Sequence, residues 1–159
     1  MCYVFQGIIN EPVLHGTKLT NWTMIRMPLS DEKIIEKFAT SAKQDMLNFD
    51  PFNTPFTFWK GTLTLQCQEK ALDTFLEFDG FTKGVVWVNG FNLGRYWPRL
   101  GPQKTLYVPG PVLKGNCTEN TILLLEQDMA ECLQEGWKDG CYLMTSMEPK
   151  IDGDVPNGY

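Results

Sequence analysis

The chain has 159 residues, of which 43% are hydrophobic and 13% aromatic, so it can bury one sizeable core and is too apolar to be disordered as a whole. Its net charge of −5, without clustered Lys and Arg, argues against a nucleic-acid partner. No apolar stretch approaches the roughly 20 residues that cross a bilayer, so no membrane span is expected.

The first third of the chain predicts two strands, a short helix and a long loop. Residues 3–9 form a short apolar run, and Trp22–Met27 alternates in the loose way of a half-buried strand. Ser30 is followed by two acids, which is typical of a helix cap, and apolar residues on one face predict a short helix over 31–39. Asn, Asp and Pro then accumulate over 40–55, which indicates a loop insertion.

Strand patterns return at Phe56 and continue to Glu126. The run Phe56–Gln66 predicts either one long strand broken near Gly61 or a bent pair of strands, and Thr74–Phe78 alternates with its apolar residues on one side. Lys104–Val108 predicts a further strand, and Thr121–Glu126 is apolar enough to be a central strand covered on both faces. About eight strands, one short helix and no internal repeat are typical of an all-β sandwich or jelly roll.

The clearest turn signal lies between Gly80 and Pro98. Val85–Val88 is β-branched or aromatic, and Asn89-Gly90 is the pair that a two-residue turn with positive φ requires. Gly94 then indicates a bend or bulge before an aromatic run. Strand, turn and strand are therefore predicted, with an aromatic tip that is either a binding loop or a packing contact.

Two uses of this tip remain open. In a carbohydrate site, Tyr96 and Trp97, with Trp87 as a further candidate, would stack on a sugar ring while Arg95 bonds its hydroxyls. Alternatively, Tyr96 and Trp97 pack against a neighbouring loop or domain. Trp87 lies in the middle of a predicted strand, so we expect it in the core.

The cysteines and two glycosylation sequons point to the secretory pathway. Cys132 and Cys141 flank a turn-rich segment and can form a disulfide, the alternative being two free buried thiols; the pairing of the other three cysteines stays open. The sequons predict glycosylation at Asn21 and Asn116. The opening MCYVFQGIIN has no basic segment and no cleavage site, so we expect no signal peptide there.

Metal and cofactor sites are not expected. The chain has one histidine, His15, and no CxxC pair, which leaves a zinc site short of its usual ligands. An independent enzyme is also disfavoured, because no histidine or paired acids form a recognisable catalytic site.

Four longer segments carry a resemblance to a known family. In order and spacing, FTKG, VWVNGFNLGRYW, GPQKTLYVP and TILLLE closely resemble the C-terminal β-sandwich of the family 35 glycoside hydrolases, the animal lysosomal-type β-galactosidases. FQGIINEPVLHGTKLTNWTMIRMPL is similar to the start of that sandwich, and Cys132 to Cys141 resembles a short disulfide loop of the animal enzymes. The resemblance covers roughly residues 5–130, is weak from Lys33 to Phe58, and has Phe81 where Trp is common.

The resemblance implies a galactose-binding-like jelly roll, in our reading one domain over 1–147 with a frayed tail at 148–159. It also implies β-galactosidase ancestry, hydrolysis of terminal β-D-galactose in the full-length enzyme, and a lysosomal or secreted location. A retaining glycosidase needs two carboxyl groups about 5 Å apart. In this family both glutamates lie in an N-terminal TIM barrel, which this chain lacks, so no catalytic residue can be carried over.

Two functions follow as expectations. In the first, the chain is an accessory domain or fragment of a β-galactosidase, its partner is the catalytic TIM barrel, and it is inactive alone. In the second, it is a stand-alone carbohydrate-binding module that binds galactosides.

Overall fold

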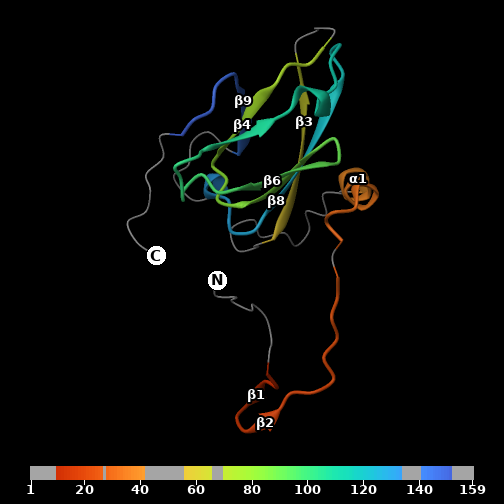
Figure 1. The fold of residues 1–159 in the computed structure, drawn as a ribbon, viewed down its shortest axis with the longest axis vertical. Helices are drawn as coiled ribbons and strands as arrows, with labels where there is room; N and C mark the ends of the chain where they lie inside the picture. The colour runs from red at the N-terminus through yellow and green to blue at the C-terminus, as the bar shows by residue number, and fades with distance from the viewer. Residues whose placement is uncertain (1–9, 27, 42–55, 66–69, 134–140, 152–159) are drawn as a thin grey trace, which may run out of the picture.

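The computed structural model describes residues 10–26, 28–41, 56–65, 70–133 and 141–151. Its body is an all-β sandwich of two antiparallel sheets, with one helix beside the larger sheet (Figure 1). The larger sheet has the order β3-β8-β5-β6 and the smaller β7-β4-β9. The first contains β3 (Thr57–Thr64), β5 (Gly84–Val88), β6 (Phe91–Tyr96) and β8 (Glu119–Glu126). The second contains β4 (Thr74–Asp79), β7 (Thr105–Val108) and β9 (Tyr142–Ser146).

The main core lies between the two sheets. In strands β4, β5 and β8, apolar residues at every second position point into this core, because successive side chains of a strand point to opposite faces. These inward residues are Leu76, Phe78, Val86, Val88, Ile122 and Leu124. The predicted one-sided alternation of β4 is thereby confirmed.

A second apolar cluster lies on the outer face of the larger sheet. Helix α1 (Glu32–Ser41) places Ile35 over Trp87, Leu123 and Leu125, with Leu29 packed beside them. The indole N–H of Trp87 donates to the Leu29 carbonyl oxygen at 3.2 Å. β8 is therefore covered on both faces, which explains its unbroken apolar run and confirms that prediction.

The helix begins at Glu32, one residue after its predicted start at residue 31. Asp31, not Ser30, caps it, since the Asp31 carboxylate accepts a hydrogen bond from the Lys33 backbone N–H at 3.0 Å. The helix then runs to Ser41, beyond its predicted end at residue 39. Most of the predicted loop insertion, residues 42–55, lies outside the described residues.

The predicted hairpin is present as β5 and β6. Asn89 and Gly90 form its turn with φ of 51° and 85°, the positive values that this pair was expected to supply. The register passes from Val86↔Gly94 to Trp87↔Asn92, so β6 carries one extra residue beside Gly94. This bulge confirms the predicted irregularity and turns Tyr96 towards the core.

Other expectations were wrong at particular strands. Within the predicted strand Trp22–Met27, residues 22–26 are exposed and belong to no strand, while a small hairpin precedes them at β1 (Val13–Leu14) and β2 (Thr17–Lys18). β3 continues without a break through Gly61. The predicted strand at residues 3–9 lies outside the described residues.

The C-terminal part contains structure that the sequence pattern did not indicate. β9 pairs with β4 after the short 3-10 helix η2 (Glu131–Leu133). An earlier 3-10 helix, η1 (Gly110–Val112), overlaps the single helical turn that the sequence predicts at Val112–Lys114. The beginning of the predicted frayed tail is also held in place, because the Lys150 N–H donates to the Thr105 hydroxyl at 3.0 Å. Residues 152–159 lie outside the described residues. No helix in the described part of the chain is long and apolar enough to cross a membrane.

Candidate functional site

Tyr96, one of the three residues expected at the aromatic tip, is a core residue. Its side chain is 3% exposed, and its ring stacks on Phe78 with the centroids 4.4 Å apart. Its hydroxyl donates to Glu126 Oε2 at 3.2 Å. Burial, and then the charge of Glu126, raise the pKa of the Tyr96 hydroxyl above its ordinary value. Tyr96 is therefore not accessible to a sugar. It is buried because the bulge in β6 turns its side chain to the core side of the sheet.

Arg95 and Trp97 lie close to each other near the end of the edge strand β6. The Arg95 guanidinium lies 4.4 Å from the centroid of the Trp97 ring, and the Lys83 ammonium lies 5.2 Å from it. Both distances suit cation–π contacts. Lys83 also pairs with Asp128 at 2.8 Å. A sugar that stacked on Trp97 would compete with two cations for its ring.

Glu126 is the most buried acidic side chain among the described residues, with 1% exposure. Its Oε2 accepts hydrogen bonds from the Thr82 N–H at 2.8 Å and from Tyr96. Its Oε1 accepts from the Lys83 and Asp128 N–H groups, both at 3.1 Å. With four donors bound, this carboxylate fixes the connection between β4 and β5 against the end of β8. It has a structural role and is not placed for acid–base chemistry.

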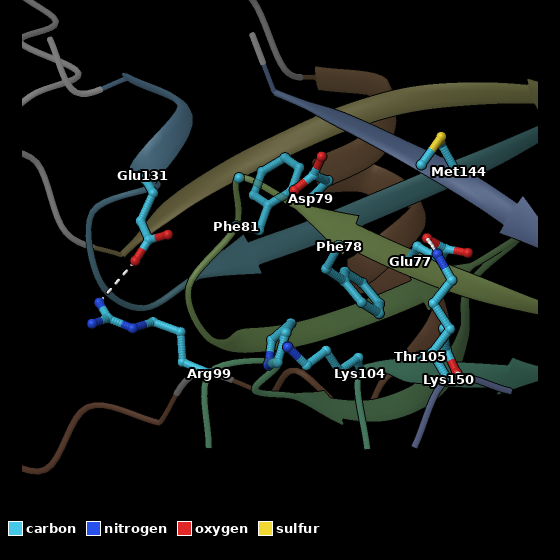
Figure 2. A pocket seen from close by; sticks show the side chains of 12 residues that line it. Glu77, Phe78, Asp79, Phe81, Arg99, Lys104, Thr105, Glu131, Met144 and Lys150 are labelled. Carbon is cyan, nitrogen blue, oxygen red and sulfur yellow. Dashed lines mark hydrogen bonds and ion pairs between the residues drawn. The ribbon is translucent and has the colours of Figure 1, made fainter. Parts of the chain in front are cut away.

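A cleft of about 400 Å³ opens at the end of the smaller sheet where β4 leads into the loop before β5 (Figure 2). Four separate segments meet there: the end of β4 with the following loop, the residues after β6 up to the start of β7, η2, and the stretch from β9 to the tail. Most of the lining residues are charged or apolar; the full set is Glu77, Phe78, Asp79, Gly80, Phe81, Pro98, Arg99, Lys104, Thr105, Glu131, Met144 and Lys150.

Two ion pairs stand at opposite sides of this cleft. Figure 2 shows Arg99 with Glu131 on one side and Lys150 with Glu77 on the other. The first pair joins Arg99 Nη1 to Glu131 Oε1 at 2.8 Å, and the second joins Lys150 Nζ to Glu77 Oε2 at 2.6 Å. These contacts hold four long side chains in place, although partly exposed pairs add little to stability.

Two further charged groups lie between these pairs. Asp79 is on the upper side of the view and Lys104 on the lower side (Figure 2). Asp79 Oδ2 accepts a hydrogen bond from the Tyr142 hydroxyl at 2.8 Å. Within the described residues Lys104 has no ion-pair partner, and its backbone N–H donates to the Lys150 carbonyl at 2.9 Å. The cleft thus offers one oriented carboxylate and one ammonium in addition to its two ion pairs.

A disulfide between Cys132 and Cys141 supports one wall of the cleft. The two Cα atoms are 5.1 Å apart, and the Cys132 N–H donates to the Gly80 carbonyl at 3.0 Å. The predicted pairing is therefore present, and it ties the helix that carries Glu131 both to β9 and to the loop after β4. Cys117 is also disulfide-bonded.

The two sequon asparagines are exposed, Asn116 on a turn and Asn21 in a segment outside any helix, strand or turn. Asn21 and Asn116 have φ of 60° and 54°, and the side chains of both sequons face solvent. This exposure would admit a glycan. No group of three or more His, Cys, Asp or Glu side chains suited to a metal ion occurs among the described residues.

The sequence pattern did not indicate the cleft. Glu77 and Asp79 alternate with core residues of β4 and so read as solvent-facing positions, while Lys104 and Lys150 lie beside turns. Only the contact between four distant segments brings these charges together.

One family model matches the central part of the chain. Residues 56–120 match the model of the family described as "Beta-galactosidase, galactose-binding domain", and this range lies within the sandwich and contains most of the cleft lining.

Particular relatives extend the similarity beyond this range. A β-galactosidase of Mus musculus is 40% identical over 152 residues, which cover 86% of this chain and 22% of the relative. The Homo sapiens enzyme is 37% identical over 139 residues, 80% of this chain and 20% of the relative. "Beta-galactosidase 17" of Arabidopsis thaliana is 36% identical over 133 residues, 78% and 19% respectively. The chain is therefore homologous to β-galactosidases over most of its length, and it spans about a fifth of the length of these relatives.

Proposed function

We propose that the chain is a non-catalytic β-sandwich domain of a β-galactosidase, which packs against the catalytic part of that enzyme and stabilises it. The observation that carries this proposal is the unequal coverage of the mouse relative: 86% of this chain aligns with only 22% of the enzyme. The partner would be the TIM barrel that the resemblance to family 35 implies.

The state of the cleft carboxylates supports a non-catalytic role. Glu77 and Glu131 are each held by a cation, and Asp79 accepts a hydrogen bond from Tyr142. A retaining glycosidase needs one carboxylate free to attack and a second carboxyl group free to donate a proton. Because cations hold Glu77 and Glu131, Asp79 is the one carboxylate of this cleft without an ion-pair partner among the described residues, and a single carboxylate cannot fill both roles.

The N-terminal segment supports a packing role. Residues 10–26 extend away from the sandwich in Figure 1, and three large apolar side chains in this segment are more than half exposed to solvent. Trp22, Met24 and Ile25 are 61%, 89% and 84% exposed. Apolar side chains gathered on one exposed segment are typical of a surface that another protein part covers. In the proposed enzyme, that part is the remainder of the polypeptide.

A lysosomal or secreted location belongs to the same proposal. The Cys132–Cys141 disulfide and the exposed sequons at Asn21 and Asn116 suit an oxidising compartment in which glycans are added. Mass spectrometry of the chain secreted from animal cells behind an added signal peptide, with and without glycosidase treatment, would test both asparagines.

Activity of the isolated chain tests the proposal directly. We expect the purified 159-residue chain to hydrolyse a chromogenic β-galactoside no faster than buffer does. The mouse β-galactosidase serves as the positive control. Turnover that survives repeated purification and follows the concentration of the chain would contradict a non-catalytic role.

A second candidate function is carbohydrate binding by the sandwich itself. The observation that favours it is the description of the matching family as a galactose-binding domain, together with the polar cleft inside the matched range. This function is compatible with the first, because an accessory domain can also hold part of a glycan.

A further inference from the structure

We propose that the cleft binds a neutral pyranose sugar through Asp79 and Lys104. This inference rests on the carbohydrate-binding candidate above and assigns it a site. It also moves the site away from the aromatic tip at Arg95–Trp97, where the sequence pattern first placed it.

The charges of the cleft favour a neutral ligand. Three acids and three bases line it, and four of these six groups are already paired with each other. An anion would approach the carboxylates of Glu77, Asp79 and Glu131, whereas a cation would approach three positive side chains. Either charge would meet repulsion that a neutral ligand avoids.

The two remaining charged groups favour a ligand with hydroxyls. Asp79 can only accept hydrogen bonds and Lys104 can only donate them. A hydroxyl group does both, so neighbouring hydroxyls of one sugar can satisfy both residues. The Tyr142 hydroxyl holds Asp79 Oδ2 and so orients the carboxylate before the ligand arrives. Such preorganisation lowers the entropy lost on binding.

The size and the apolar lining also fit a monosaccharide unit. The volume of about 400 Å³ lies within the range of roughly 300–1,000 Å³ that is usual for small-molecule sites. Met144 is 43% exposed and lines the cleft together with Phe81 and Pro98, so the lining offers apolar contact for the C–H groups of a sugar ring.

The aromatic tip is the less suitable surface. Tyr96 is buried, and the ring of Trp97 is in contact with Arg95 and Lys83. A sugar would have to displace these cations before it could stack there. At the cleft, no such contact has to be broken.

The test is a titration of the ¹⁵N-labelled chain with methyl β-D-galactopyranoside, followed by amide chemical shifts. We expect saturable shifts at Gly80, Thr105 and their neighbours. Asp79→Asn and Lys104→Met should each weaken binding by roughly ten- to a hundredfold, because each removes a hydrogen bond to a charged group. Lys60→Met and Glu119→Gln are the matched controls, since both residues are exposed and lie outside the cleft.

Three outcomes would overturn the assignment. The first is the absence of saturation up to the solubility of the sugar. The second is saturable shifts around Trp97 that Trp97→Ala abolishes and the cleft variants leave intact. The third is tighter binding of glycine, as a zwitterion probe, or of galacturonate, as an anionic probe. Lys104 is exposed, so we expect Lys104→Met to fold normally. If Asp79→Asn fails to fold, Lys104→Met alone still tests the assignment.

Failure here is distinguishable from failure of the accessory role. An accessory domain need not bind sugar, so a negative titration leaves that proposal to the activity measurements. Conversely, turnover by the isolated chain would contradict the accessory role without any change in the titration result.

Discussion

At the scale of a single residue, Glu126 shows how hydrogen bonds stabilise a carboxylate that is buried in this sandwich. The side chain is 1% exposed, yet three backbone N–H groups and the Tyr96 hydroxyl donate to it. Gly84 makes room for this arrangement, since a Cβ there would collide with the Leu125 carbonyl and the Tyr96 hydroxyl. A buried charge is tolerated only when its hydrogen-bonding capacity is met in this way.

Replacing this carboxylate by its amide should therefore be costly. In Glu126→Gln, one of the two accepting oxygens becomes an NH₂ group that faces donors. We expect the free energy of unfolding to fall by about 2–4 kcal/mol. Urea denaturation followed by tryptophan fluorescence measures the change. Glu119→Gln, on the exposed start of the same strand, should stay within about 0.5 kcal/mol of the wild type; equal effects at the two positions would contradict the assigned role.

Asp73 gives a prediction about pH. The Tyr107 hydroxyl donates to Asp73 at 2.6 Å and the Gly110 N–H donates at 2.7 Å, and these bonds lower the pKa of the carboxyl group. Because the pKa in the folded state is below that in the unfolded chain, the contribution to stability is complete above about pH 4 and is lost as the pH falls through the folded-state value.

The hydroxyl of Tyr107 is the largest cause of this shift. In Tyr107→Phe we expect the pKa of Asp73 to rise towards its ordinary value, as measured by NMR titration of the carboxyl carbon. Tyr142→Phe removes a comparable hydroxyl from Asp79 and should leave the pKa of Asp73 unchanged. An unchanged Asp73 titration in Tyr107→Phe would show that the hydrogen bond is not the cause.

At the scale of elements, helix α1 turns a two-layer sandwich into a locally three-layered one. Ile35 is 1% exposed and packs on Trp87, Leu123 and Leu125. Ile35→Ala should lower the free energy of unfolding by about 2–4 kcal/mol, because it leaves a cavity between helix and sheet. The same substitution at Ile25, which is 84% exposed, should have an effect below about 0.5 kcal/mol. Thermal or urea unfolding of both variants compares them, and similar losses would contradict the packing.

Local signals determined the elements that the sequence pattern predicted correctly. Asn89-Gly90 can form the tight turn because both residues adopt positive φ. The sequence of β8 indicates cover on both faces because Ile122–Leu125 places apolar side chains on each of them in turn. Such features depend on a few neighbouring residues, so they are visible in the sequence.

Long-range contacts decided what the pattern missed. β9 has a mixed pattern and becomes a strand because β4 offers it an open edge. Tyr96 faces the core because one extra residue in β6 reverses the alternation. The cleft forms where four segments that are distant in the sequence come together, and the local pattern of none of these segments predicts that contact.

At the scale of the whole molecule, the exposed N-terminal segment has a consequence for the isolated chain. Apolar side chains at Trp22, Met24 and Ile25 favour association with any available apolar surface. We expect size-exclusion chromatography with light scattering to show dimers or larger species at high concentration. Replacing these three residues by Ser should shift the chain to a monomer without changing its unfolding transition. A wild-type chain that stays monomeric at every concentration would contradict the proposed docking role of this segment.

The central claim, that this chain is a domain working inside a β-galactosidase, can be measured in a chimera. The matching fifth of the mouse enzyme would be deleted in one variant and replaced by this chain in another. We expect the deletion to abolish folding and β-galactosidase activity, and the replacement to restore both, with the three Ser substitutions reducing the restored activity. Full activity in the deletion variant, or a folded chimera without activity, would contradict the claim.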